Sequence, residues 1–135
     1  MRKTGGSVEE DVYTLIKNSS LKTSIQGSLY REGMRPINSV NEDAIVSFLS
    51  GLDGQIQTGV LNLNIYVPDI VSDKQKVKNI SRCSELEVLA NTFIQSLSLS
   101  GDYQFELDKM IQTFKSQDIE QHFVNCRIKF NLSTI

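Results

Sequence analysis

The stretch GVLNLNIYVPDI, residues 59–70, alternates apolar and polar residues more regularly than any other part of the chain. In a β-strand, successive side chains point to opposite faces, so the two kinds of residue separate onto two faces. The apolar face consists of Leu61, Leu63, Ile65 and Val67, and the polar face of Asn62, Asn64 and Tyr66. This pattern is typical of an antiparallel sheet with one face on a hydrophobic core and one face exposed. The stretch therefore predicts a sheet that needs a cover on one side only.

Other parts of the sequence supply neighbours for this strand. Residues 43–49, DAIVSFL, also alternate, and the glycine-rich SGLDG at 50–54 predicts a turn, so these two strands should form a β-hairpin. Residues 28–31 predict a short strand, and residues 103–113 predict a longer one with a bulge or bend near its middle. The last strand has an apolar face made by Val124, Cys126, Ile128, Phe130 and Leu132. We therefore expect a mostly antiparallel sheet.

Two segments have the periodicity of amphipathic helices. The first opens at Ser7, which stands at capping-box spacing from Glu10, and its apolar residues fall on one face. The second opens at Ser84, which has the same spacing to Glu87, and it has the clearest helical face in the chain. Residues 1–6 contain two glycines and are expected to form a flexible tail.

The predicted elements follow the order α-β-β-β-α-β-β, which places the chain in the α+β class. We expect a single domain over residues 1–135, in which both amphipathic helices cover one face of the sheet. A chain of 135 residues buries roughly two-thirds of its unfolded surface, so it can fold without disulfides or metals.

The composition argues against some classes of partner. The net charge of −2 gives no overall positive field for nucleic acid or an anionic membrane surface, so we expect no direct nucleic-acid readout. No stretch approaches the roughly 20 apolar residues of a membrane span, and the sequence opens without the apolar run of a signal peptide. We therefore expect a protein that is made in a cytoplasm and has no membrane partner.

The residues that most often carry catalysis are few and far apart. His122 and Cys126 lie four residues apart on the last strand, about 13 Å at roughly 3.3 Å per residue, which is too far for a nucleophile–base pair. Cys83 precedes a predicted helix, where a thiol can be activated, so a small enzyme using Cys83 or His122 stays an alternative. The sequence has no Cys-x-x-Cys, His-x-x-x-His or P-loop spacing. Our expectation is a protein that is not an enzyme and uses no metal or cofactor.

Two groups of polar side chains are instead candidates for protein contacts. One group lies on the polar faces of the two long strands, where amides and basic residues form flat surfaces that suit a subunit interface. The other lies in the lysine-rich connection at residues 68–83, where contact with an acidic partner competes with simple exposure to solvent. The candidate contact residues are Asn62, Asn64, Tyr66, Lys74, Lys76, Lys78, Arg82, Asn125, Arg127 and Lys129.

The layout of the chain resembles that of a known family. A helix, SVEEDVYTLIKNS, is followed by SIQGSLYREGMRP, a long hairpin, a helix SELEVLANTFIQSL, and closing strands that end in VNCRIKFNL. This arrangement is similar to the tail terminator, or tail completion, proteins of long-tailed bacteriophages and prophages.

The resemblance implies a structural protein of the virion that is made in the bacterial host cytoplasm. Members of that family form hexameric rings, so the partners implied are further copies of the chain, the tail-tube protein and the head connector. The natural ring contacts would be the hairpin 43–67 and the loop 68–83. Two alternatives stay open: another neck or tail component of similar fold, and a small monomeric α+β protein-binding module.

Overall fold

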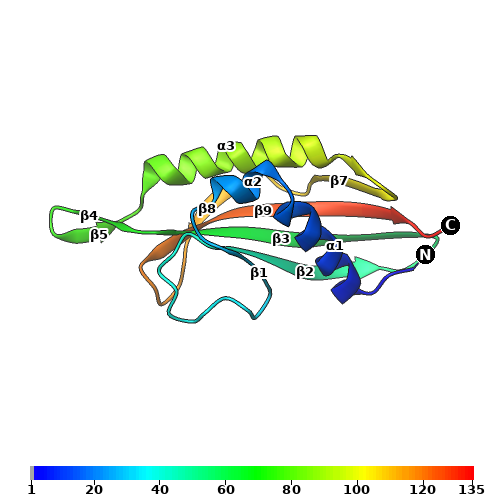
Figure 1. The fold of residues 1–135 in the computed structure, drawn as a ribbon, viewed down its shortest axis with the longest axis horizontal. Coiled ribbons are helices and arrows are strands. Elements are labelled where there is room, and N and C mark those ends of the chain that lie inside the picture. The colour runs from blue at the N-terminus through cyan, green and yellow to red at the C-terminus, as the bar shows by residue number, and fades with distance from the viewer. Residues whose placement is uncertain (1) are drawn as a thin grey trace.

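The structure, a computed structural model, describes residues 2–135 except for the side chain of Leu99. Figure 1 shows helices lying along one side of a long sheet, a hairpin projecting from one end, and the C-terminus at the opposite end. In chain order the elements are α1 (Gly5–Lys17), α2 (Ser20–Ser24), β1 (Leu29–Arg31), β2 (Ala44–Leu52), β3 (Ile56–Pro68), β4 (Ile70–Ser72), β5 (Gln75–Val77), α3 (Ile80–Leu97), β6 (Leu99–Ser100), β7 (Tyr103–Leu107), β8 (Gln112–Lys115) and β9 (Gln121–Ser133).

The main sheet has the strand order β1-β2-β3-β9-β7-β6, and β8 also pairs with β9. Its pairs are antiparallel except for β1 and β2, which run parallel over three residues. The strands β4 and β5 form a separate two-stranded sheet. The predicted α+β class with a mostly antiparallel sheet is confirmed.

The sheet is organised around β3, which pairs with β9 at thirteen successive positions from Ile56 to Pro68. Buried side chains face buried side chains across this pair, as where Leu61 lies opposite Ile128 and Leu63 opposite Cys126. On the other face, the intervening side chains of β3 are half-exposed. The two faces predicted from the alternation are confirmed.

The apolar face of the sheet is covered by helices. Helix α1 contacts β2 and β1, and α3 contacts β9 and β7, as Figure 1 shows. The buried helical side chains are Val8, Val12, Ile16, Cys83, Leu86, Ala90, Phe93, Ile94 and Leu97. Full burial of a side chain such as Leu86 contributes about 1.5–3 kcal/mol relative to exposure. These contacts confirm the predicted cover of two amphipathic helices, to which the short α2 is added.

The predicted helix start at Ser7 is wrong, and Gly5 and Gly6 of the predicted tail belong to the helix, while Met1 lies outside the described residues. Helix α1 begins at Gly5, and the Ser7 N–H donates to the Thr4 hydroxyl oxygen, which makes Thr4 the N-cap. Upstream of the cap, the Lys3 N–H donates to the side-chain oxygen of Gln57 at 2.9 Å, and the Gln57 amide donates back to the Lys3 carbonyl at 2.9 Å. These two bonds attach the segment to β3, which the sequence alone could not reveal.

The predicted start of the second helix is also wrong. Helix α3 begins at Ile80, and the Asn79 side-chain oxygen accepts from the Arg82 N–H at 3.2 Å, so Asn79 is the N-cap. Ser84 and Glu87, the predicted capping box, both lie inside the helix.

The preceding connection contains a hairpin that the sequence analysis missed. Strands β4 and β5 are joined at Asp73 and Lys74, which have positive φ angles of 49° and 65°. Two successive residues with positive φ make a type I′ turn, whose twist suits a two-residue β-hairpin. The Asn-Gly or Asp-Gly pair that usually predicts such a turn is absent, because Asp73 is followed by Lys74. The sequence pattern therefore did not indicate the hairpin.

The expected bend in the strand at 103–113 is a complete break. Strand β7 pairs with the second half of β9, and β8 pairs with its first half, so the two lie end to end along one edge of β9. Gly101, with φ of 60°, lies in the turn between β6 and β7, after the end of α3 at Leu97.

The N-cap of α3 gives a direct test of where the helix begins. Asn79→Ala removes the acceptor for the Arg82 N–H and should lower the free energy of unfolding by about 1 kcal/mol. Ser84→Ala should leave it unchanged or slightly raised, because alanine has a higher helix propensity than serine inside a helix. Urea unfolding followed by circular dichroism measures both; a larger loss for Ser84→Ala would contradict the start at Ile80.

Candidate functional site

The face of the sheet opposite the helices is the first candidate site, and it is called here the open face. Its side chains alternate with the buried ones along β2, β3, β8 and β9. By cross-strand register the open face comprises Ile45, the buried Ser47, Asn62, Asn64, Tyr66, Phe114, Phe123, Asn125, Arg127 and Lys129. Six of the predicted contact residues therefore lie together on one surface.

The three asparagines of the open face form a cluster. The Asn125 side-chain amide donates to the side-chain oxygens of Asn62 at 3.2 Å and Asn64 at 2.7 Å. These bonds hold the three side chains in fixed orientations across the β3–β9 pair. All three remain half-exposed, so the cluster presents an ordered polar surface.

Next to the asparagines lies a row of aromatic rings that the sequence analysis only partly identified. Tyr66 and Phe123 have ring centroids 5.5 Å apart, and Phe123 and Phe114 are 5.7 Å apart. The Arg35 guanidinium lies over the Tyr66 ring, 4.4 Å from its centroid. Phe114, at the end of the row, is 42% exposed. The alternation of β9 predicts that Phe123 and Cys126 lie on opposite faces of the sheet. The aromatic neighbours of Phe123 depend on the register of β9 with β3 and β8.

The basic residues of the open face are paired along the sheet. Arg127 lies 2.9 Å from Asp108, and Lys129 lies 3.8 Å from Glu106. All four side chains are at least a quarter exposed, so each pair contributes at most about 1 kcal/mol to folding. The paired charges reduce the net charge of the surface without burying it.

Arg82, by contrast, belongs to an internal ion pair. Its guanidinium donates to both carboxylate oxygens of Glu42, at 2.7 and 2.8 Å, and to the carbonyl of Ser24. The hydrogen bonds and charge of Glu42 raise the pKa of Arg82. Arg82 lies in α3 and not in a loop, and it ties this helix to the segments around Ser24 and Glu42.

A second buried carboxylate, Asp43, anchors the loop that follows β1. Asp43 accepts from the Ser28 N–H at 2.8 Å, the Ser39 hydroxyl at 2.5 Å and the Arg35 guanidinium at 3.1 Å. Burial would raise the pKa of the Asp43 carboxyl, but these hydrogen bonds and the charge of Arg35 lower it below its ordinary value. Arg35 also donates to Gln121, so this network fixes the guanidinium over the aromatic row.

The hairpin β4–β5, residues 70–77, is the second candidate site and is called the arm. Figure 1 shows it extending beyond the end of the sheet. Lys74 and Lys76 are exposed on it, and Lys78 follows at its base. Ile70 and Val71 are exposed as well, at 46% and 66%. The lysines predicted to lie in an irregular loop are therefore carried by an ordered hairpin.

The base of the arm is fixed to the sheet through Asp69. The buried Asp69 carboxylate lies 2.7 Å from Nδ1 of His122 on β9, and the Asp69 N–H donates to the Glu120 carbonyl at 3.0 Å. Lys115 lies 3.8 Å from the same carboxylate. These contacts place His122 in a structural hydrogen bond at the root of the arm.

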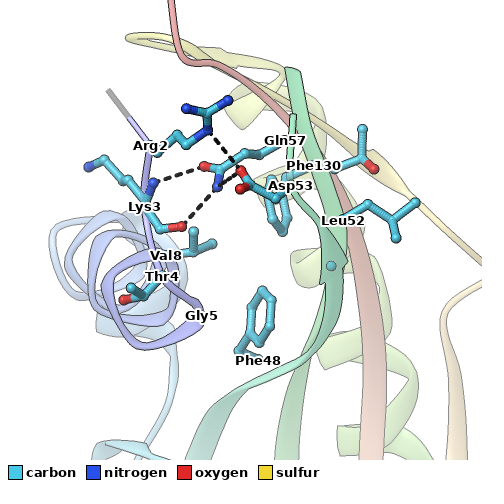
Figure 2. A pocket seen from close by; sticks show the side chains of 12 residues that line it. Arg2, Lys3, Thr4, Gly5, Val8, Phe48, Leu52, Asp53, Gln57 and Phe130 are labelled. Atoms are coloured by element: carbon cyan, nitrogen blue, oxygen red, sulfur yellow. Dashed lines mark hydrogen bonds and ion pairs between the residues drawn. The ribbon is translucent and has the colours of Figure 1, made fainter. Parts of the chain in front are cut away.

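At the opposite end of the sheet lies a hollow, called the end pocket, of about 440 Å³ (Figure 2). Its lining includes Val8, Phe48, Leu52, Asp53, Gln57 and Phe130. Figure 2 shows Phe48 between the start of α1 and the sheet, and an ion pair between Arg2 and Asp53, which are 3.3 Å apart. Gly5 allows this closeness, because a Cβ there would lie 2.7 Å from the Phe48 ring.

The two cysteines are poorly suited to nucleophilic chemistry. Both are buried, and burial raises the pKa of Cys83 and raises that of Cys126 to about 12. Among residues 2–135, side chain of Leu99 excepted, no three His, Cys, Asp or Glu side chains form a cluster that could hold a metal ion. Within the same described residues, none of the helices has the length and apolar character of a membrane span.

Comparisons with known proteins do not identify the chain. No family model matches the sequence, and no curated protein matches it. One solved structure, whose name states no function, aligns over 96% of this chain and 93% of its own length, with 13% sequence identity and a TM-score of 0.46. Similarity at that level carries no argument, so the function has to be inferred from the surfaces of the chain itself.

The Asp43 network predicts a loss of stability in acid. A carboxyl whose pKa is lowered by folding stabilises the protein above its unfolded pKa of about 4, and this contribution disappears as the pH falls through the folded value. Asp43→Asn should cost about 3 kcal/mol at pH 7, because Arg35 loses its buried partner, and it should flatten the decline of stability below pH 4.

Urea unfolding between pH 2 and pH 7 measures both effects. Asp73→Asn, the same chemical change in the exposed turn of the arm, should leave the pH dependence of wild type. Equal acid profiles for wild type and Asp43→Asn would contradict the role given to Asp43.

Proposed function

We propose that this chain is a structural protein of the head–tail junction of a long-tailed bacteriophage or prophage, acting there as the tail terminator. In this proposal six copies form a ring that closes the end of the tail tube and then contacts the head connector. The protein is then part of the virion, made in the host cytoplasm, and has no catalytic activity or cofactor. The resemblance in layout, from SVEEDVYTLIKNS to VNCRIKFNL, suggests the family.

The observation that carries the proposal is the open face of the sheet. It combines an aromatic row with ordered amides, and aromatic residues are enriched at protein interfaces. Phe114, which is 42% exposed, gives this surface an apolar point of contact. Such a surface suits a large flat partner better than a small ligand.

Ring closure follows from the kind of contact that an asymmetric surface makes. When one patch of a subunit binds a different patch of the next, the contact is heterologous and forms either a closed ring or an open filament. A closed ring has no free patch left, so no further copy of the chain can join it. A protein that terminates a tube needs this property.

A second function, a monomeric protein-binding module, is favoured by the arm. The arm carries Lys74 and Lys76 with exposed Ile70 and Val71, a combination that could bind an acidic partner without any ring. Another neck or tail component of similar fold is compatible with the same surfaces. Oligomeric state separates the module from the junction proteins, and partner choice separates the junction proteins from one another.

The native mass tests the proposal. Light scattering behind a sizing column should give about six times the 15.2 kDa mass of the chain, and negative-stain images of that peak should contain rings with a central hole. If only monomer is found, incubation with assembled tail-tube protein follows, and the tube ends should become capped. A monomer that also ignores tube ends would contradict the proposal and favour the binding module.

The open face makes a more specific prediction at Arg127. Arg127→Glu should weaken self-association by about tenfold or more and leave the fold intact, because the side chain is 33% exposed and its pair with Asp108 contributes little to folding. The charge-swapped variant Arg127→Glu with Asp108→Arg restores the pair within the chain. If Arg127 contacts a neighbouring copy, this swap does not restore association, as sedimentation velocity would measure. Full recovery in the swap would contradict a contact through Arg127.

A further inference from the structure

Strand β8 forms an edge of the main sheet, because it pairs with β9 on one side and, among the described residues, with no strand on the other. Gln112, Phe114 and Lys115 of this strand are exposed. An edge of this kind can pair with a strand of another chain, and many proteins prevent such pairing with a proline or a bulge. Strand β8 has no proline, and its register with β9 is continuous. The edge is therefore open to a further strand.

The pairing with β9 decides which backbone groups of β8 are free. Ser116 continues the register, and its N–H donates to the Gln121 carbonyl at 3.0 Å. Hydrogen-bonded and non-hydrogen-bonded positions alternate in an antiparallel pair, so Phe114 also bonds to β9, whereas Thr113 and Lys115 do not. The N–H and C=O groups of Thr113 and Lys115 therefore point away from β9. In the part of the chain that the structure describes, none of these groups has a hydrogen-bond partner.

The aromatic row of the open face ends at this free edge. It runs from Tyr66 through Phe123 to Phe114, with ring centroids 5.5 and 5.7 Å apart. Phe114 has an aromatic neighbour on the β9 side and remains 42% exposed. Aromatic side chains directly opposite each other on neighbouring strands stabilise a sheet. A strand added at this edge would therefore fit best with an aromatic residue opposite Phe114.

A second copy of β8 supplies this strand. When two copies lie antiparallel with Phe114 opposite the partner's Phe114, Thr113 lies opposite the partner's Lys115 on both sides of the centre. These are the residues with free backbone groups, so each pair exchanges two N–H···O bonds. A register centred on Thr113 would place Phe114 opposite Gln112, and one centred on Lys115 would place two like charges together. The register centred on Phe114 is therefore favoured.

The charges on the helix side of the sheet agree with this register. The Thr113 hydroxyl donates to the Glu87 carboxylate of α3 at 2.6 Å, and Glu87 forms no ion pair among the described residues. The Lys115 side chain lies on the same face as Thr113 and is 55% exposed, although it is 3.8 Å from Asp69 of its own chain. Pairing places Lys115 of one copy next to Thr113 of the other and hence close to the unpaired Glu87. The two-fold symmetry repeats this attraction.

We propose that two free copies of the chain pair through β8, antiparallel and with their Phe114 side chains opposite each other. The contact is isologous, so both copies use the same patch and no further copy can be added through it. It goes beyond the proposed function, whose ring needs a different, heterologous contact. The dimer is then the form of the chain before it joins a ring.

Cross-linking tests the register. The two Cα atoms of a non-hydrogen-bonded antiparallel pair are within disulfide range, so Phe114→Cys should form a disulfide-linked dimer under mild oxidation. Gln112→Cys is the control on the same face: its copies would be roughly 13 Å apart along the strand. At equal protein concentration, Phe114→Cys should cross-link at least about tenfold faster. The native Cys83 and Cys126 are buried and give no background.

A proline tests the backbone pairing. Thr113→Pro removes an N–H that bonds across the contact and not to β9, so it should raise the dissociation constant of the dimer at least about tenfold. Thr113→Val is the matched control, since it also lacks the hydroxyl but keeps the N–H, and it should dimerise like wild type. Sedimentation velocity measures both, and thermal unfolding by circular dichroism shows whether both fold.

A charge substitution gives the same test without a change of backbone. Phe114→Glu places two carboxylates opposite each other at the centre of the contact and should abolish the dimer. Gln112→Glu adds the same charge two residues away and should keep it. This pair of variants decides the contact if Thr113→Pro does not fold.

The outcomes separate this inference from the proposed function. At concentrations below those that form a ring, wild type should have twice the 15.2 kDa mass of the chain. A monomer there, or equal cross-linking of Phe114→Cys and Gln112→Cys, overturns the β8 contact and leaves the tail-junction proposal to the capping of tail tubes. A dimer that Thr113→Pro dissociates and Thr113→Val keeps supports the β8 contact. If that dimer neither forms a ring nor caps tubes, the proposed function fails and the β8 contact stands.

Discussion

The pairing of β3 with β9 is the constraint on which the rest of the structure depends. Along most of its thirteen positions, buried residues of β3 lie opposite buried residues of β9, as Leu63 lies opposite Cys126. Because side chains alternate with a period of two, a slip of one residue would turn the apolar faces outward. The register therefore creates one dry face, and α1 and α3 can bury their own apolar stripes only on that face.

The same register produces the surface to which we assign function. It brings Asn125 to Asn62 and Asn64, and it places Phe123 between Tyr66 and Phe114. The register that buries the core on one face of the sheet therefore also orders the side chains of the open face. A rigid surface loses little conformational entropy on binding, which suits the assembly role that we propose.

Buried carboxylates hold the segments that the sheet does not order by itself. Asp43 fixes the loop after β1 through Arg35, and the adjacent Glu42 fixes the start of α3 through Arg82. Asp69 does the same at the root of the arm through His122. Each is a carboxylate near the end of a strand, where a chain leaving the sheet has to be directed. The arm and the loop therefore have defined positions relative to the open face and the end pocket.

The sequence by itself determined the class of fold, the two faces of the long strands, the hairpin around Asp53 and the apolar faces of both long helices. These features depend on residues close together in the chain, because apolar residues repeat with a period of 2 in strands and 3.6 in helices. Only the tertiary structure decided the caps at Thr4 and Asn79, the internal role of Arg82, the ordered arm and the end pocket. Each of these depends on a partner distant in sequence or on competition between nearby polar side chains. Such pairings are settled by the register of the sheet and the packing of the helices, and local periodicity carries no information about them.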